Sequence, residues 1–291
     1  MGAEALNDDR HYLLGHTEHE LKRLDLQGVI YRDATLRAFH DGGLEAGMRV
    51  LDIGCGTGDV TLTAGEVVGP TGSVLGIDRG PQAIATARAK VGDKAGIDFE
   101  VTELDDFLRP DDFDAIVGRF ILMHQPDPVA VLRSLLASLK AGGVVVIIES
   151  WMELLRTGGH SQPHSPFYDD IVQWKSDVVR GAGADLHAGG RLRSVFREAG
   201  LDEPTTRQEA LVAGGPDSPY YEYVEQSVRS MLPEARRLGL GGFDEESTRG
   251  MADRLREEVT SVNGSLLAWP VVAAWSRKEL PPRTSIVLPS S

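Results

Sequence analysis

The segment from Val50 to Asp59, Val-Leu-Asp-Ile-Gly-Cys-Gly-Thr-Gly-Asp, constrains the fold of this chain more than any other. Residues 49–53 form a short, largely apolar run that predicts a buried strand. Three glycines at every second position follow it, and residues 60–64 can open a helix. Glycines at such positions allow a sharp turn and let a flat ligand lie against bare backbone. The segment therefore predicts the strand, turn and helix of a ligand-binding unit.

An acid at the end of the next apolar run indicates what kind of ligand this unit binds. Asp78 follows residues 73–77 and stands twenty residues after Gly58. An acid there can accept hydrogen bonds from both hydroxyls of a ribose, which predicts a nucleoside-binding βαβ unit. A dinucleotide fingerprint would be Gly-x-Gly-x-x-Gly, and the third glycine here comes one residue early. Asp52 and Asp59 would also repel a pyrophosphate, whereas they suit a ligand that carries positive charge.

Residues 52–58 have the pattern Asp-x-Gly-x-Gly-x-Gly, and here the sequence resembles the class I S-adenosylmethionine-dependent methyltransferases, of which this is the first motif. Residues 113–128 are similar to the fourth motif and the segment after it, and the Leu-Lys-Ala-Gly-Gly turn at 139–143 is also typical of the family. The resemblance covers residues 44–150. It implies S-adenosylmethionine as cofactor and an α/β fold, a doubly wound, seven-stranded Rossmann-like sheet whose seventh strand is antiparallel and lies between the fifth and sixth.

Periodicity predicts the other elements and the organisation of the chain. We expect strands at 97–101, 113–117, 144–148, 205–212 and 269–278, two N-terminal helices at 11–29 and 30–39, and later helices at 81–89, 129–140, 190–200, 220–232 and 247–262. The predicted organisation is an N-terminal helical cover (1–43), a cofactor-binding core (44–213) with a substrate-lining segment (151–190), a helical lid (214–264), the last core strand (265–280) and a tail (281–291). The sixth and seventh strands of this fold normally form a hairpin. An insertion between them as long as 214–264 needs a functional or packing reason.

The resemblance also implies which residues hold the cofactor. The expected set is Tyr12, Asp52, Gly54, Cys55, Gly56, Gly58, Asp78, Arg79, Glu103, Leu104, Arg119 and His124. In similar methyltransferases an N-terminal helix often carries an aromatic residue near the cofactor, and Tyr12, His16 and Tyr31 are the candidates. Glu103 stands where the family commonly has Asp, so its carboxylate would reach one methylene further to the adenine amino group.

His124 and Glu149 are the candidate catalytic residues. Methyl transfer is an in-line displacement, so the enzyme must position the acceptor atom and remove a proton if that atom carries one. His124 follows the fourth strand, at the mouth of the sheet, and an imidazole with an ordinary pKa of about 6.5 suits a base near neutral pH. Histidines at the matching place act as base in several small-molecule O-methyltransferases that resemble this chain. The competing interpretation is that His124 only shapes the pocket, and that Glu149 makes a structural hydrogen bond.

The aromatic segment after the fifth strand is where the family often places its acceptor pocket. Trp151, His164, Tyr168 and Trp174 are the expected substrate-binding residues, and they favour a flat or apolar small-molecule acceptor. O-methylation is the favoured reaction, with C- or N-methylation open. Two alternative functions also stay open: a binding protein or non-methylating enzyme that keeps the cofactor on the same fold, and a nicotinamide-dependent oxidoreductase.

Composition narrows the partners of this 291-residue chain. Its net charge of −14 argues against a nucleic-acid partner, because phosphate binding needs a basic face. No apolar run approaches the ~20 residues of a membrane span, and the N-terminal sequence predicts neither a signal peptide nor myristoylation. The single cysteine, Cys55, excludes a disulfide framework and a thiolate metal site, and no other metal site is expected. We therefore expect a cytoplasmic protein without membrane contact, and a homo-oligomer remains open.

Overall fold

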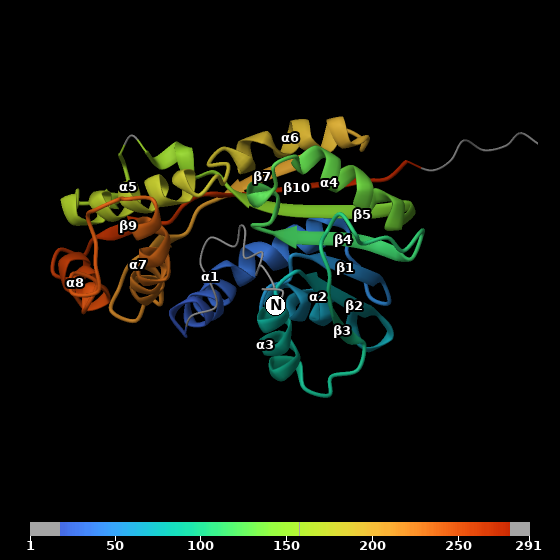
Figure 1. Ribbon diagram of the computed structural model, residues 1–291, viewed down its shortest axis with the longest axis horizontal. Helices are drawn as coiled ribbons and strands as arrows, with labels where there is room; N and C mark the ends of the chain where they lie inside the picture. The colour runs from blue at the N-terminus through green and yellow to red at the C-terminus, as the bar shows by residue number, and fades with distance from the viewer. Residues whose placement is uncertain (1–17, 157, 280–291) are drawn as a thin grey trace, which may run out of the picture.

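The computed structural model describes residues 18–156 and 158–279, and a seven-stranded sheet forms its centre (Figure 1). The strand order is β3-β2-β1-β4-β5-β10-β7. Strands β1 to β5 are parallel to one another, and β10 is antiparallel to both β5 and β7. The strands are β1 (Arg49–Ile53), β2 (Ser73–Asp78), β3 (Ile97–Val101), β4 (Phe113–Arg119), β5 (Leu139–Ser150), β7 (Thr205–Glu209) and β10 (Val271–Arg277). The predicted α/β class and the doubly wound, Rossmann-like sheet are confirmed.

Helices cover both faces of this sheet, and alternation along the strands explains how each face is buried. In β5, Val144, Val146 and Ile148 belong to one apolar core, whereas Val145 and Ile147 belong to another. The first core packs under the N-terminal helices and the second under α4 and α6, because successive side chains of a strand point to opposite faces. The helices are α1 (Glu18–Gly42), α2 (Asp59–Val68), α3 (Pro81–Val91), α4 (Pro128–Leu135) and α6 (Ala188–Ala199).

The other described helices and strands form a cap beyond the carboxyl ends of β1 and β4 (Figure 1). It contains three helices and a small sheet of order β6-β9-β8. These elements are α5 (Pro166–Gly181), α7 (Tyr220–Arg237), α8 (Met251–Thr260), β6 (Ser161–Gln162), β8 (Val212–Ala213) and β9 (Ser265–Leu267). Helix α7 packs against α1, so the cap and the N-terminal helix close over the same edge of the sheet.

The N-terminal segment differs from the prediction of two helices. The described part is one continuous helix, α1, that passes through Gly28 without a break. A Cβ at Gly28 would lie 2.7 Å from Cγ of Asp59, so this glycine lets α1 approach the start of α2 closely. The glycine therefore serves packing and does not end a helix. Residues 1–17, where the prediction began, lie outside the described part.

Other boundaries differ for identifiable reasons. The predicted sixth strand, 205–212, ends at Glu209, because Val212 and Ala213 pair with β9 in the small sheet. Helix α7 continues through Pro233, where the prediction ended it at Leu232. Strand β5 begins at Leu139, before the predicted Val144, and a shift in register against β4 absorbs the glycine turn. Within residues 18–156 and 158–279, no helix has the length and apolar character needed to cross a membrane.

Candidate active site

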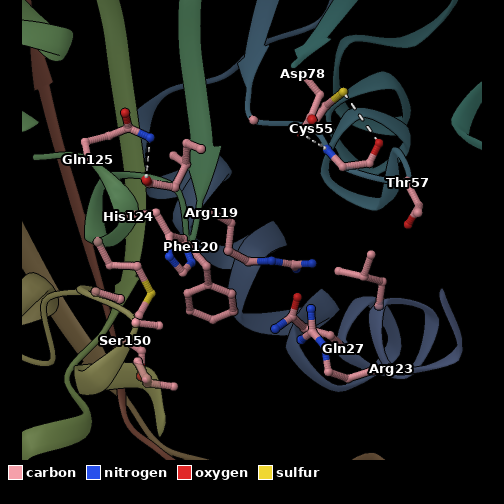
Figure 2. A pocket seen from close by; sticks show the side chains of 18 of the residues that line it. Arg23, Gln27, Cys55, Thr57, Asp78, Arg119, Phe120, His124, Gln125 and Ser150 are labelled. Atoms are coloured by element: carbon pink, nitrogen blue, oxygen red, sulfur yellow. Dashed lines mark hydrogen bonds between the residues drawn. The ribbon is translucent and has the colours of Figure 1, made fainter. Parts of the chain in front are cut away.

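One large cavity lies between the carboxyl ends of β1, β2 and β4, the helix α1 and the cap (Figure 2). Its volume is about 760 Å³, within the range typical of small-molecule sites. One part is lined by the glycine turn and the strand ends, and the other part by side chains of the cap and α1. The cavity therefore has room for two molecules side by side, one held by the core and one by the cap.

The glycine turn after β1 presents backbone to this cavity. Gly54, Gly56 and Gly58 have φ values of 62°, 52° and 86°, a region that side-chain-bearing residues rarely adopt. A Cβ at Gly54 would lie 2.4 Å from Cδ1 of Ile121, and one at Gly58 would lie 3.0 Å from Cζ of Phe99. Gly56 lines the cavity, and a Cβ there would meet no atom within 4 Å, so it would project into the open space. Gly56 thus leaves a flat surface for a ligand, while Gly58 is a packing position outside the cavity.

Asp78 lies at the end of β2 and lines the cavity beside the glycine turn. Its Oδ2 accepts a hydrogen bond from the backbone N–H of Gly56 at 3.0 Å, and its Oδ1 accepts one from Gly80 at 2.8 Å. Each carboxylate oxygen can accept a second hydrogen bond, so both remain able to bind hydroxyls of a ligand. Arg79, Glu103 and Leu104 line the same part of the cavity, as the sequence predicts.

The two acids that flank the glycine turn in the sequence differ in whether they line the cavity. Asp52 is buried below the turn and does not line the cavity, and its Oδ2 accepts a hydrogen bond from the Thr61 hydroxyl at 2.6 Å. Burial raises the pKa of Asp52 to about 7. Asp59 does line the cavity, and burial raises its pKa as well, although Lys90, whose Nζ lies 3.5 Å from Oδ1, opposes the shift. Asp52 is therefore corrected from a cofactor contact to a support of the turn.

Cys55 lines the cavity as a packed, uncharged side chain. It is the free cysteine of the glycine turn, and its Sγ lies 3.8 Å from the carbonyl oxygen of Gly56. Burial raises the pKa of the Cys55 thiol well above its usual value. Because only the thiolate is a strong nucleophile, this position favours a wall of the pocket over covalent catalysis.

The end of β4 places a cation and an aromatic ring in the cavity. Arg119 extends into the middle of the pocket in the view of Figure 2, and its Nη1 donates a hydrogen bond to Oγ1 of Thr35 at 3.0 Å. Phe120 has a φ of 57°, and its ring meets that of Tyr31 edge-on at a centroid distance of 5.3 Å. The ring of Tyr31 in turn meets that of Tyr223 of α7 edge-on, at a centroid distance of 6.4 Å. Phe120, Tyr31 and Tyr223 form what we call the aromatic wall of the cavity.

Glu149 holds the segment that follows β4. Its carboxyl is fully buried in β5, and Oε1 accepts hydrogen bonds from the backbone N–H groups of Ile121 at 2.9 Å and Leu122 at 2.6 Å. Burial raises the pKa of Glu149 to about 8, against the opposing effect of these hydrogen bonds. Oε2 has no hydrogen-bond partner and Glu149 does not line the cavity. Glu149 therefore holds the segment 120–124 from outside the cavity, which favours the structural interpretation over a catalytic role.

His124 ends the short 3-10 helix η2 (Leu122–His124) that Glu149 holds, and its side chain faces the cavity (Figure 2). Burial, and then the positive charges of Arg23 and Arg79, lower the pKa of His124 to about 4. The imidazole is therefore neutral at physiological pH and able to accept a proton. It lies at the junction between the strand ends and the cap, where the prediction places the base.

The acceptor residues predicted from the aromatic segment do not line the cavity. Trp174 donates from Nε1 to the carbonyl oxygen of Gly241 at 2.8 Å, and the Tyr168 hydroxyl bonds that of Tyr220 at 2.6 Å. His164 is exposed and pairs with Asp169 at 2.7 Å. Trp151 packs on α6, where a Cβ at Gly190 would lie 2.6 Å from its Cε2. All four are corrected to packing or surface positions. Tyr12 and His16 lie outside the described residues.

The cap side of the cavity is formed by residues that the sequence analysis did not single out. They come from α1, the segments after β4 and β5, α5, α7 and the approach to β10: Arg23, Leu24, Gln27, Phe120, Met123, Ser150, Met152, Lys175, Val179, Tyr223, Ser227, Met231 and Trp269. One signal in the sequence could have identified this side of the cavity. Lys175 interrupts the apolar stripe of α5 between Ile171 and Val179, at a spacing of four residues, where a charged side chain needs a reason.

No group of three or more His, Cys, Asp or Glu side chains within 18–156 and 158–279 is arranged to hold a metal ion. His160 and His164, which are four residues apart, both bond to Asp169. That carboxylate therefore explains the pair without a metal.

Comparisons with known proteins agree with this geometry. The family model described as a methyltransferase domain matches residues 44–200. The chain is 33% identical over 188 residues to the demethylmenaquinone methyltransferase of Lactococcus lactis, covering 60% of this chain and 73% of the relative. It is 32% identical over 223 residues to the enzyme of the same name from Staphylococcus aureus, covering 74% of this chain and 83% of that relative.

A solved structure shares the fold. It is the phosphoethanolamine N-methyltransferase 2 of Haemonchus contortus in complex with phosphomonomethylethanolamine and S-adenosylhomocysteine, with a TM-score of 0.54 and 15% identity. The match covers 89% of this chain and 58% of that one. From the family model and the two bacterial relatives together, we conclude that this chain belongs to the family of S-adenosylmethionine-dependent methyltransferases.

Proposed function

We propose that this methyltransferase acts on a flat, largely apolar small molecule that carries a ring oxygen, of the quinone type that the names of its two bacterial relatives indicate. One observation carries the proposal: a single cavity joins the glycine turn and the strand ends to an apolar, aromatic cap, with His124 between them. The enzyme uses S-adenosylmethionine, which supplies an electrophilic methyl carbon on its sulfonium.

The core side of the cavity suits this cofactor. Gly56 offers bare backbone to a flat group, Asp78 can accept hydrogen bonds from ribose hydroxyls, and Glu103 lines the same side and can accept one from an adenine amino group. Burial lowers the pKa of the Arg119 guanidinium, but arginine remains charged, so it can bind the carboxylate of the amino-acid part. Asp59 lines the same region and suits its ammonium group.

The cap side suits a flat acceptor. The aromatic wall and Trp269 give ring faces and edges against which a planar molecule can stack, and Met123, Met152 and Met231 adapt to an irregular apolar outline. This lining differs from the predicted acceptor residues but leads to the same class of acceptor. A large macromolecular acceptor is disfavoured because α1 and α7 pack against each other over the cavity.

His124 is the proposed base for transfer to a hydroxyl oxygen. Its neutral imidazole can take the proton of an acceptor hydroxyl as the oxygen attacks the methyl carbon. Glu149 fixes the backbone on which His124 stands, so the position of the imidazole depends on two buried hydrogen bonds. In-line displacement requires little else from the protein than this positioning and exclusion of water.

The test is a transfer assay with S-adenosylmethionine labelled with ¹³C in its methyl group, offered with reduced naphthoquinones, simple phenols and aliphatic alcohols. We expect the label on the reduced naphthoquinones, and the chemical shift of the product identifies the methylated atom. Label on a ring carbon would overturn O-methylation while keeping the acceptor class. Transfer only to aliphatic alcohols would overturn the acceptor class.

A further inference from the structure

Lys175 is a buried cation for which residues 18–156 and 158–279 supply no counter-ion. It lies on the inner face of α5 with only 4% of its surface exposed, and it lines the cavity. Its Nζ lies 4.4 Å from the ring centroid of Trp269 and 5.4 Å from that of Tyr223. Among residues 18–156 and 158–279 it forms no ion pair or side-chain hydrogen bond with a carboxylate. Burial, and then the positive charge of Arg23, lower the pKa of Lys175 to about 7.

This arrangement is costly unless the lysine serves a ligand. Buried charges in proteins are almost always paired, because removing an ammonium from water costs several kcal/mol that two aromatic faces recover only in part. The cavity is the side on which a partner can still be placed, since Trp269 and Tyr223 occupy the others. A ligand that completes the site must therefore carry negative charge and lie close to Trp269 and Tyr223, which line the same cavity.

We propose that Lys175 binds an anionic oxygen of the acceptor, a phenolate or enolate oxygen on a flat ring that lies against Trp269 and Tyr223. This assignment rests on the proposed function and narrows it: the acceptor ring carries, besides the methylated position, a second oxygen that is ionised when bound. Lys175 is then a specificity-determining residue, since a neutral ring of the same shape would leave its ammonium buried and unpaired.

The surrounding lining agrees with such an acceptor. Ser150 and Ser227 are the small hydroxyl groups of the cap side and can support polar ring substituents, while Met152 and Val179 are apolar. The carboxylates that line the cavity are Asp59, Asp78, Glu103 and Glu234, and none of them is among the groups whose charge acts on Lys175. Among the described residues no carboxylate acts on Lys175, which favours an anion over a cation or a zwitterion as its partner.

Binding of a matched pair of probes tests the assignment. The probes are 2-hydroxy-1,4-naphthoquinone, whose hydroxyl is ionised at neutral pH, and 1,4-naphthoquinone, which is neutral and of nearly the same shape. Calorimetry on the complex with S-adenosylhomocysteine should show that the wild type prefers the ionised probe. In Lys175→Met this preference should fall about 10- to 100-fold, the effect of losing a buried charge-assisted contact, while affinity for the neutral probe holds or rises.

The control and the contrary outcomes separate this assignment from the proposed function. Lys94→Met removes an exposed lysine and should keep the preference. Lys175→Met should also melt at the same or a higher temperature without acceptor, since the ammonium has no carboxylate partner among the described residues. A clearly lower Tm would mean a structural role and overturn the assignment. If the preference survives in Lys175→Met, the assignment fails alone. If neither probe binds the wild type while S-adenosylhomocysteine does, the flat-ring acceptor fails and the assignment with it.

Discussion

At the scale of single residues, Glu149 shows how a buried carboxyl supports the reactive segment without touching it. Its Oε1 accepts two backbone N–H groups, and its Oε2 is buried without a partner among the described residues, so an ionised carboxylate would be poorly solvated there. The pKa of Glu149 is raised to about 8, whereas the pKa of a glutamate in the unfolded chain is about 4.3. Between these values the folded state binds more protons than the unfolded state, so the free energy of unfolding falls as the pH rises.

Glu149→Gln should therefore reduce the fall in the free energy of unfolding that accompanies rising pH. The amide oxygen can accept the same two hydrogen bonds and carries no proton to lose. Urea unfolding at pH 5.5 and pH 8 should show a smaller loss of stability in Glu149→Gln than in the wild type, where one such group contributes at most about 1.4 kcal/mol per pH unit. The pKa of Asp52 is also raised, so Asp52 contributes part of the pH dependence of stability in both proteins. Glu149→Ala should lose about 1–3 kcal/mol for each N–H left without an acceptor. An unchanged slope in Glu149→Gln would contradict a protonated Glu149.

His124 carries the second prediction at this scale. His124→Ala should lower kcat at least about 10²-fold while leaving affinity for S-adenosylhomocysteine nearly unchanged, because we assign His124 to the acceptor and not, as the resemblance also implies, to the cofactor. Since the pKa of His124 is lowered to about 4, the acidic limb of the wild-type profile of kcat/KM should lie below about pH 5, and not near pH 6–7 as an ordinary imidazole suggests.

The acidic limb should be absent in His124→Ala. A residue that only shapes the pocket would not change this limb when it is replaced. His187→Ala changes an exposed histidine outside the cavity and should behave as the wild type. Normal kcat in His124→Ala, with the limb retained, would leave His124 as a shape contact and positioning as the mechanism.

At the scale of elements, helix α7 is the part of the predicted lid that reaches the cavity. It contributes Tyr223, Ser227 and Met231 to the lining and is joined to α1 by the pairs Lys22–Glu222 at 2.7 Å and His19–Gln226 at 2.8 Å. Such partly exposed contacts are weak individually, which suits a cover that opens. Whether the segment 214–264 moves stays a prediction.

Hydrogen exchange can test that movement. S-adenosylhomocysteine together with an acceptor should slow exchange of the backbone amides of α7 and of the facing part of α1, because ligand contacts hold both in the closed position. Helix α8 packs on α7 but does not line the cavity, so it serves as an internal comparison. Equal exchange in α7 with and without both ligands would exclude a mobile cover.

At this scale the sequence predicts the core better than the cap for a physical reason. Strand alternation and the glycine turn are local patterns, so β1 to β4 follow from short windows. The break expected near Val29 is absent because Gly28 packs on Asp59, a contact thirty-one residues away in the chain. Trp174 and Lys175 are neighbours, yet about 100° of helix rotation directs one to Gly241 and the other into the cavity. Only tertiary packing decides between them.

At the scale of the whole molecule, the two sides of the cavity differ in how they are assembled. The core side comes from a few turns at successive strand ends, at residues 54–57, 59–60, 78–79 and 102–104, with Arg119 at the end of β4. The cap side brings together α1, α5, α7 and Trp269, which are far apart in the sequence. Motif spacing can therefore identify the cofactor site, whereas the acceptor site depends on contacts that no local pattern encodes.

This difference leads to a prediction for the stability of the molecule as a whole. S-adenosylhomocysteine binds the folded state alone, so at about 100 times its Kd it should stabilise the protein by about 2.7 kcal/mol and raise Tm by about 5 °C or more. NADH at the same concentration should leave Tm unchanged, because Asp59 lines the cavity beside the turn that a pyrophosphate would need.

Asp78→Ala removes the ribose acceptor and should weaken binding at least tenfold, which lowers the stabilisation by about 1.4 kcal/mol. Asp78 also accepts the N–H of Gly56, so the ligand-induced shift, and not the ligand-free Tm, is the quantity to compare. Asp98→Ala, at an exposed position of β3 outside the cavity, should keep the full shift. A full shift in Asp78→Ala would remove Asp78 from the cofactor site, and a shift with NADH would contradict the discrimination assigned to Asp59.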